Sequence, residues 1–121
     1  MSIRRFEDIH ARQEARLLVK KICSPASEGA FVKDFHLRDQ ICGVAISVMA
    51  NIVAGFDCDS NTEFTRFLGI ARRSAVEVQS LLYTAMDVGN ITPEQLKANC
   101  EQAGKIKMFI SAFKSAMPKE Y

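Results

Sequence analysis

The chain has 121 residues, of which 48% are hydrophobic and 25% charged, the composition of a single soluble globular domain with a core of its own. Sixteen basic and fourteen acidic residues give a formal net charge of +2, so the overall charge does not point to a nucleic-acid partner. The first residues contain no apolar stretch of the signal-peptide type, and we expect a cytoplasmic protein.

The first predicted element is an amphipathic helix over residues 5–23. Its apolar residues recur at steps of four, three and four and therefore share one helical face. They are Ala11, Ala15, Leu18 and Ile22. The Ser24-Pro25 pair ends this helix because proline cannot continue the hydrogen-bond ladder. A connection follows, with Asp34 as the candidate N-cap of the next helix.

The second predicted helix, over residues 36–56, has no charged side chain from Gln40 onward. It is apolar nearly all round, whereas a surface helix shows a polar side to water. Because a chain of this length has little interior, we expect another copy of the protein to cover part of the helix. The run is slightly short for a membrane span and contains Ser47 and Asn51, so we expect no membrane partner. Gly55 is predicted to close the helix in a left-handed conformation.

The third predicted helix, over residues 61–88, begins at a capping box formed by Ser60 and Glu63. Its apolar residues follow a heptad seam with alternating steps of four and three. The seam comprises Phe64, Leu68, Ala71, Ala75, Val78, Leu82 and Ala85. A second apolar row beside it includes Phe67 and Ile70, and Gly89-Asn90 ends the helix.

The fourth predicted helix, over residues 93–117, begins with Thr92 as N-cap, Pro93 at the first helical position and Gln95 three residues after the cap. Its stripe comprises Leu96, Cys100, Ala103, Ile106, Ile110, Phe113 and Met117. Four long helices with mostly short links predict an all-α fold, an up-down-up-down antiparallel four-helix bundle that forms one domain over residues 1–121.

The residues do not form a recognisable catalytic or metal site. A di-metal bundle needs two Glu-x-x-His units, and Glu7 to His10 is the only one, because Lys33 precedes His36 at the required spacing. Phosphate loops, dinucleotide fingerprints and nucleophile elbows are absent from the sequence. We therefore expect a protein that is not an enzyme and has neither a metal nor a cofactor.

The four cysteines lack the spacing of a metal finger. In a cytoplasmic protein we expect them to be reduced thiols that mostly pack as small hydrophobic side chains. They are Cys23, Cys42, Cys58 and Cys100. Cys58 lies in a polar turn and is the one that we expect to be exposed.

Two polar residues are predicted to point inward, Asn51 in the second helix and Glu77 beside the seam of the third. Buried polar groups of this kind tend to fix the register or the oligomeric state. The residues that we assign to the core or to contacts between copies are Ile46, Met49, Asn51, Val53, Phe56, Phe67, Ile70 and Glu77. An enzyme whose site lies between subunits, at Asn51 and Glu77, is the weakest alternative.

Basic residues recur on the first and third helices. They are either a solvated surface or, multiplied around an oligomer, a surface that binds phosphates. The candidate nucleic-acid-binding residues are Arg12, Arg16, Lys20, Arg66, Arg72 and Arg73.

Taken together, these motifs resemble the bacterial family of 23S rRNA intervening-sequence proteins. The most specific part is Asn-Ile-x-x-Gly-Phe from Asn51, followed by Ser-x-x-Glu-Phe-x-Arg-Phe-Leu from Ser60. The resemblance extends over about residues 5–117 and implies a four-helix protomer that assembles into a closed ring, commonly a homopentamer. It also implies kinship with the accessory variability protein of diversity-generating retroelements, which binds a reverse transcriptase and nucleic acid.

Several positions differ from the family pattern. Arg12 stands where a tryptophan is frequent, and Cys42-Gly43 replaces a pair of arginines. The loop after Phe56 is acidic instead of basic. The missing positive charges favour a self-assembling, non-enzymatic bundle. The alternative is an RNA- or DNA-binding protein, or an accessory protein of a reverse transcriptase.

Overall fold

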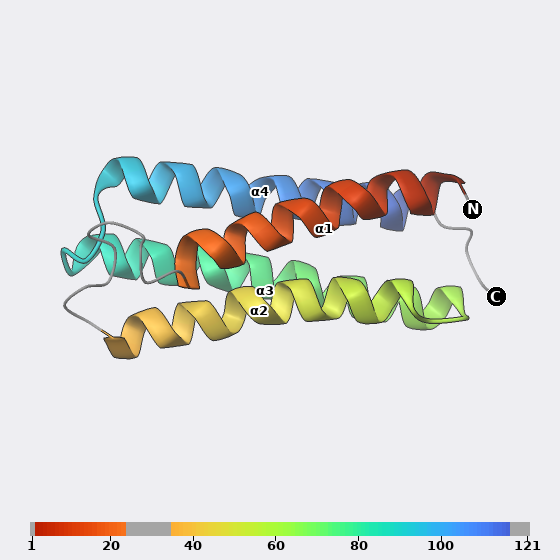
Figure 1. The fold of residues 1–121 in the computed structure, drawn as a ribbon, viewed down its shortest axis with the longest axis horizontal. Coiled ribbons are helices and arrows are strands. Elements are labelled where there is room, and N and C mark those ends of the chain that lie inside the picture. Colours follow the sequence, from red (N-terminus) through yellow and green to blue (C-terminus); the bar gives the residue numbers. More distant parts are fainter. Residues whose placement is uncertain (1, 24–34, 117–121) are drawn as a thin grey trace.

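The computed structural model describes residues 2–23 and 35–116, and it confirms the predicted all-α fold (Figure 1). The four helices are α1 (Ser2–Cys23), α2 (Phe35–Phe56), α3 (Asn61–Asp87) and α4 (Pro93–Ala116). Successive helices run in opposite directions. Among the described residues, α1 packs against α2 and α4, and α3 packs against the same two helices. The bundle is therefore four-cornered, with α1 and α3 at diagonally opposite corners.

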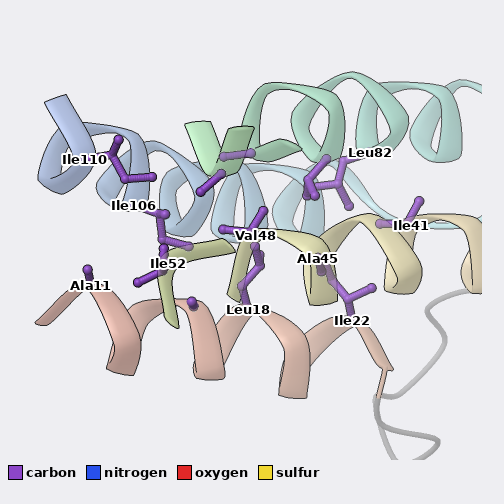
Figure 2. Close-up of a cluster of buried hydrophobic side chains, with 14 of the residues drawn as sticks. Ala11, Leu18, Ile22, Ile41, Ala45, Val48, Ile52, Leu82, Ile106 and Ile110 are labelled. Atoms are coloured by element: carbon purple, nitrogen blue, oxygen red, sulfur yellow. The ribbon is translucent and has the colours of Figure 1, made fainter. Parts of the chain in front are cut away.

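Each helix contributes one apolar stripe to a shared core (Figure 2). The predicted stripe of α1 and the whole heptad seam of α3 are buried. From α2 come Leu37, Ile41, Ala45, Val48 and Ile52. At one end of the core, Phe64 of α3 packs with Phe56 and Phe113 from the neighbouring helices, at ring-centroid separations of 5.1 to 6.0 Å. Removing these side chains from water is the main source of the bundle's stability.

The starts of α3 and α4 follow the predicted capping chemistry with one exception. The Thr92 hydroxyl accepts from the Gln95 amide at 3.1 Å, and the Gln95 side chain accepts from the Thr92 amide at 2.8 Å. Ser60 caps α3 by accepting from the Glu63 amide at 3.0 Å. The Glu63 carboxylate, however, forms an ion pair with Arg66 at 2.9 Å. The carboxylate half of the predicted capping box is replaced by this ion pair within the first turns of α3.

The two candidate helix-closing glycines behave differently. Gly89 has φ +83 and ends α3, with its amide bonded to the Met86 carbonyl and the next amide bonded to the Ala85 carbonyl. This is the Schellman arrangement. For Gly55 the prediction is wrong, because α2 continues through it to Phe56. A Cβ on Gly55 would lie 3.3 Å from the Cβ of Phe67, so the glycine instead permits close approach of α2 and α3.

The cysteines also differ from the prediction. Cys23 and Cys42 form a disulfide between the end of α1 and the first half of α2, with their Cα atoms 5.2 Å apart. The hairpin brings these two thiols together although nineteen positions separate them in the chain. Cys58 and Cys100 are free and half-buried, and the Cys58 thiol donates to the Ala54 carbonyl. The predicted N-cap Asp34 and the stripe residue Met117 lie outside the described residues.

Candidate assembly and nucleic-acid-binding surface

From Gly43 to Val53 the outward face of α2 is exposed and uncharged. Its residues recur at steps of three, four and three on the side opposite the core, which makes them a continuous stripe. They are Gly43, Ile46, Ala50 and Val53. Ile46 and Val53 keep 45% and 44% of their surface accessible to water, which is high for branched aliphatic side chains. The bundle therefore leaves one side of its most apolar helix uncovered.

This face continues into a groove between α1 and α2, which we call the α1–α2 groove. It consists of two open hollows of about 550 and 460 Å³. The apolar side chains that line them are Leu17, Val19, Met49, Ala50, Val53, Ala54 and Phe56. The polar residues that line them are Arg12, Gln13, Arg16, Lys20 and Asp57. An apolar floor beside charged side chains is suited to an amphipathic partner.

Three of the predicted basic residues lie along this groove. Arg12, Arg16 and Lys20 are all exposed and recur every four residues, so they follow one side of α1. We call them the basic rim. The disulfide lies one helical turn beyond Lys20, where Arg38 also donates to the Cys23 carbonyl at 2.9 Å. These contacts hold α1 and α2 together next to the Lys20 end of the rim.

The arginines of α3 form a separate group. Arg66 is engaged locally, because its guanidinium pairs with Glu63 and lies 4.6 Å from the centroid of the Phe67 ring. The hydrogen bonds that Arg66 donates to the Glu63 carboxylate raise the pKa of Arg66. Arg72 and Arg73 are exposed. Since α1 and α3 do not touch in the described part of the bundle, one protomer does not bring the six predicted basic residues together.

The predicted residues for contacts between copies occupy a range of environments. Met49, Asn51, Phe56, Phe67 and Ile70 are half-buried. The Asn51 side chain donates to the Ser47 carbonyl at 2.8 Å, and the hydroxyl of Ser47 lies 3.2 Å from that of Ser74, which links α2 to α3. Glu77, predicted to point inward, is exposed on the protomer because it lies outside the seam of α3.

A buried amide that the pattern did not single out links α1 to α4. Gln102 is 6% exposed and donates to the carbonyl and the carboxylate of Glu14. The side-chain carbonyl of Gln102 accepts a hydrogen bond from the ammonium of Lys21 at 3.0 Å. Gln102 stands immediately before the stripe residue Ala103, and that position at the stripe's edge is the one hint that the sequence offers. Its contacts indicate a structural role in fixing the register of the two helices.

The titratable groups show little arrangement for chemistry. Among the described residues, no group of three or more His, Cys, Asp or Glu side chains could hold a metal ion. His10 stacks on Phe109 across the α1–α4 contact, with a centroid separation of 5.7 Å. Burial raises the pKa of the Cys100 thiol, which disfavours the reactive thiolate.

One described helix is long and apolar enough to cross a membrane by length and composition, residues His36–Phe56 of α2. A core helix of a water-soluble protein can meet the same criterion. Here Ile41, Ala45, Val48 and Ile52 are fully buried in contact with the other helices. Moving α2 into a lipid bilayer would dismantle the core that these residues form.

The fold and its surface define a class of protein, the antiparallel four-helix bundle with an uncharged helix face left open to solvent. The chain belongs to the family of 23S rRNA-intervening sequence proteins, whose model matches residues 7–112. This finding confirms the resemblance carried by the motifs between Asn51 and Leu68.

A solved structure shares the fold over nearly its whole length. It is a protein of unknown function from the S23 ribosomal protein family of Bacteroides thetaiotaomicron VPI-5482. The TM-score is 0.83 at 21% sequence identity, and the match covers 91% of this chain and 99% of that chain. At this identity the likeness establishes the fold alone. A comparison with curated proteins finds no match.

Proposed function

We propose that this chain is a non-enzymatic cytoplasmic protein that self-assembles into a ring-shaped homo-oligomer, with five copies as the expected number. The observation that carries the proposal is the exposed, uncharged outward face of α2. Family membership supports it, because the resemblance to the intervening-sequence proteins implies a ring of this kind.

Hydrophobic burial would drive the assembly. Removing apolar surface from water contributes about 25 cal/mol per Å², so a stripe of aliphatic side chains along one helix adds several kcal/mol when covered. Ile46 and Val53 of α2 are exposed within the protomer, and the chain contains no charge from Gln40 to Phe56. A second copy would cover this face without disturbing the core that α2 shares with its neighbours.

The test is a matched pair of charge insertions. Val53→Glu places a carboxylate on the outward face of α2, whereas Met108→Glu does the same on α4, where Met108 is 60% exposed. Sedimentation velocity should show oligomers for the unaltered protein and for Met108→Glu. It should show monomers for Val53→Glu, because a buried unpaired charge costs several kcal/mol. A compact monomer of the unaltered chain at micromolar concentration would refute the proposal.

A second candidate function is binding of RNA or DNA, or an accessory role with a reverse transcriptase. The basic rim supports it, because Arg12, Arg16 and Lys20 form an exposed row along one helix that could contact successive phosphates. Arg72 and Arg73 could extend such a surface from a neighbouring copy in a ring. Arg66 is already engaged on the protomer, because Glu63 pairs with it.

This second candidate is tested by affinity as a function of salt. Binding of a 23S rRNA fragment should weaken steeply with salt and fall when the rim is changed to Arg12→Gln, Arg16→Gln and Lys20→Gln. Lys97→Gln and Lys105→Gln on the outward side of α4 are the control. If rRNA fragments and duplex DNA both fail to bind at low salt, the nucleic-acid function is excluded.

A further inference from the structure

We propose that copies of this chain join head to tail, with the second half of α3 from one copy seated in the α1–α2 groove of the next. This inference rests on the proposed self-assembly and specifies the two surfaces that meet. The first is the α1–α2 groove, which offers an apolar floor beside the basic rim. A partner that fits it must present apolar side chains together with negative charge.

The second half of α3 has that combination. Val76 and Tyr83 are 43% and 54% exposed, and the carboxylates of Glu77 and Asp87 lie on the same outward part of the helix. From residue 74 to residue 92 the chain contains no lysine or arginine. We call these four residues the α3 patch. Both charged residues of the patch are acidic, opposite in sign to the basic rim, and the nearest basic residue on α3 is Arg73, one turn before Glu77.

The outward face of α4 is a poorer fit for the groove. It carries the exposed side chains of Glu94, Lys97, Glu101 and Lys105, so basic and acidic charges alternate there and the face lacks the acidic character of a partner for the basic rim. Seating this face in the groove would place lysines near the arginines of the basic rim, and like charges in contact oppose association. Two grooves facing each other would meet the same repulsion, which disfavours a symmetric contact between identical surfaces.

The lengths and positions of the two surfaces allow each copy to contact two neighbours. At 1.5 Å per residue, the basic rim spans about 12 Å from Arg12 to Lys20, and the carboxylates of the α3 patch are about 15 Å apart along α3. Since α1 and α3 lie at diagonal corners, one copy can present its α3 patch to one neighbour while its groove receives another. Contacts between two different surfaces generate rings when the rotation closes.

Charge reversal tests which surfaces meet. The rim variant combines Arg12→Glu, Arg16→Glu and Lys20→Glu, and the patch variant combines Glu77→Lys and Asp87→Lys. Each should weaken assembly about tenfold or more, because it opposes like charges across the contact. The variant with all five changes should assemble like the unaltered protein. The readout is mass by sedimentation velocity, and circular dichroism checks that every variant stays helical, as expected for exposed positions.

The control reverses charges away from both surfaces, with Lys97→Glu and Lys105→Glu on α4, and should leave the mass unchanged. If the patch variant assembles normally, or if the variant with all five changes does not regain its oligomeric mass, these two surfaces do not meet. The proposed self-assembly would still stand. If the rim variant loses only rRNA binding and keeps its mass, nucleic acid occupies the groove and the inference is overturned. A monomeric unaltered protein would overturn the proposed function itself.

Discussion

Helices α2 and α4 occupy diagonal corners of the same bundle, yet their outward faces differ completely. Both pack against α1 and α3, and both bury one aliphatic stripe. The outward face of α4 carries lysines and glutamates, whereas that of α2 carries only small or aliphatic side chains between Gly43 and Val53. Position in a bundle therefore does not decide what a helix shows to solvent, and the apolar outward face of α2 is the observation on which the proposed self-assembly rests.

The largest expected effect on stability comes from truncating a buried aliphatic side chain, which both helices contribute to the core. Ile52→Ala in α2 and Ile110→Ala in α4 each remove a fully buried side chain and should lower the free energy of unfolding by about 2–5 kcal/mol. The exposed neighbours Val53→Ala and Met108→Ala should each change it by less than about 0.5 kcal/mol. Urea unfolding of dilute protein measures all four, and equal losses at buried and exposed positions would contradict the assigned core.

The next effect concerns how α1 is attached to α2. The double substitution Cys23→Ser and Cys42→Ser should lower the free energy of unfolding by about 2–4 kcal/mol, because the disulfide restricts the unfolded chain. Chemical unfolding with and without the substitutions measures the difference. In the unaltered protein, thiol titration under denaturing conditions should find two free thiols, from Cys58 and Cys100. Four free thiols would instead restore the prediction of reduced cysteines made from the sequence.

The attachment of α1 to α4 depends on hydrogen bonds instead. Gln102→Ala should cost about 1–3 kcal/mol, because the carbonyl and carboxylate of Glu14 lose a buried donor and Lys21 loses its acceptor. The control is Gln13→Ala, an exposed glutamine on α1, which should have almost no effect on thermal unfolding. If the two glutamines prove equivalent, the amide does not fix this contact.

The smallest expected effects on stability are those of substituting Gly55 in α2 and Gly104 in α4, and they should have opposite signs. Gly55→Val should destabilise the protein by about 1–3 kcal/mol, because its side chain would collide with Phe67. Gly104→Ala meets no heavy atom closer than 3.8 Å and should stabilise the protein by about 0.4–1 kcal/mol through helix propensity. Thermal unfolding of both variants checks the opposite signs.

Local patterns in the sequence determined the four helices, the core stripes and most of the caps, because these depend on residues three or four positions apart. The reciprocal bonds of Thr92 with Gln95 and the end of α3 at Gly89 are of this kind. The apolar character of α2, from which the assembly surface was predicted, is equally a property of the sequence.

Only the tertiary structure decided which side chains meet between helices. The pairing of Cys23 with Cys42, the seating of Gln102 beside Glu14 and the contact of Gly55 with Phe67 depend on the relative register and spacing of packed helices. Register is set by how all four stripes interlock, and no local spacing encodes it. For the same reason the fold alone reveals that the basic rim lies beside an apolar groove and that the arginines of α3 lie elsewhere.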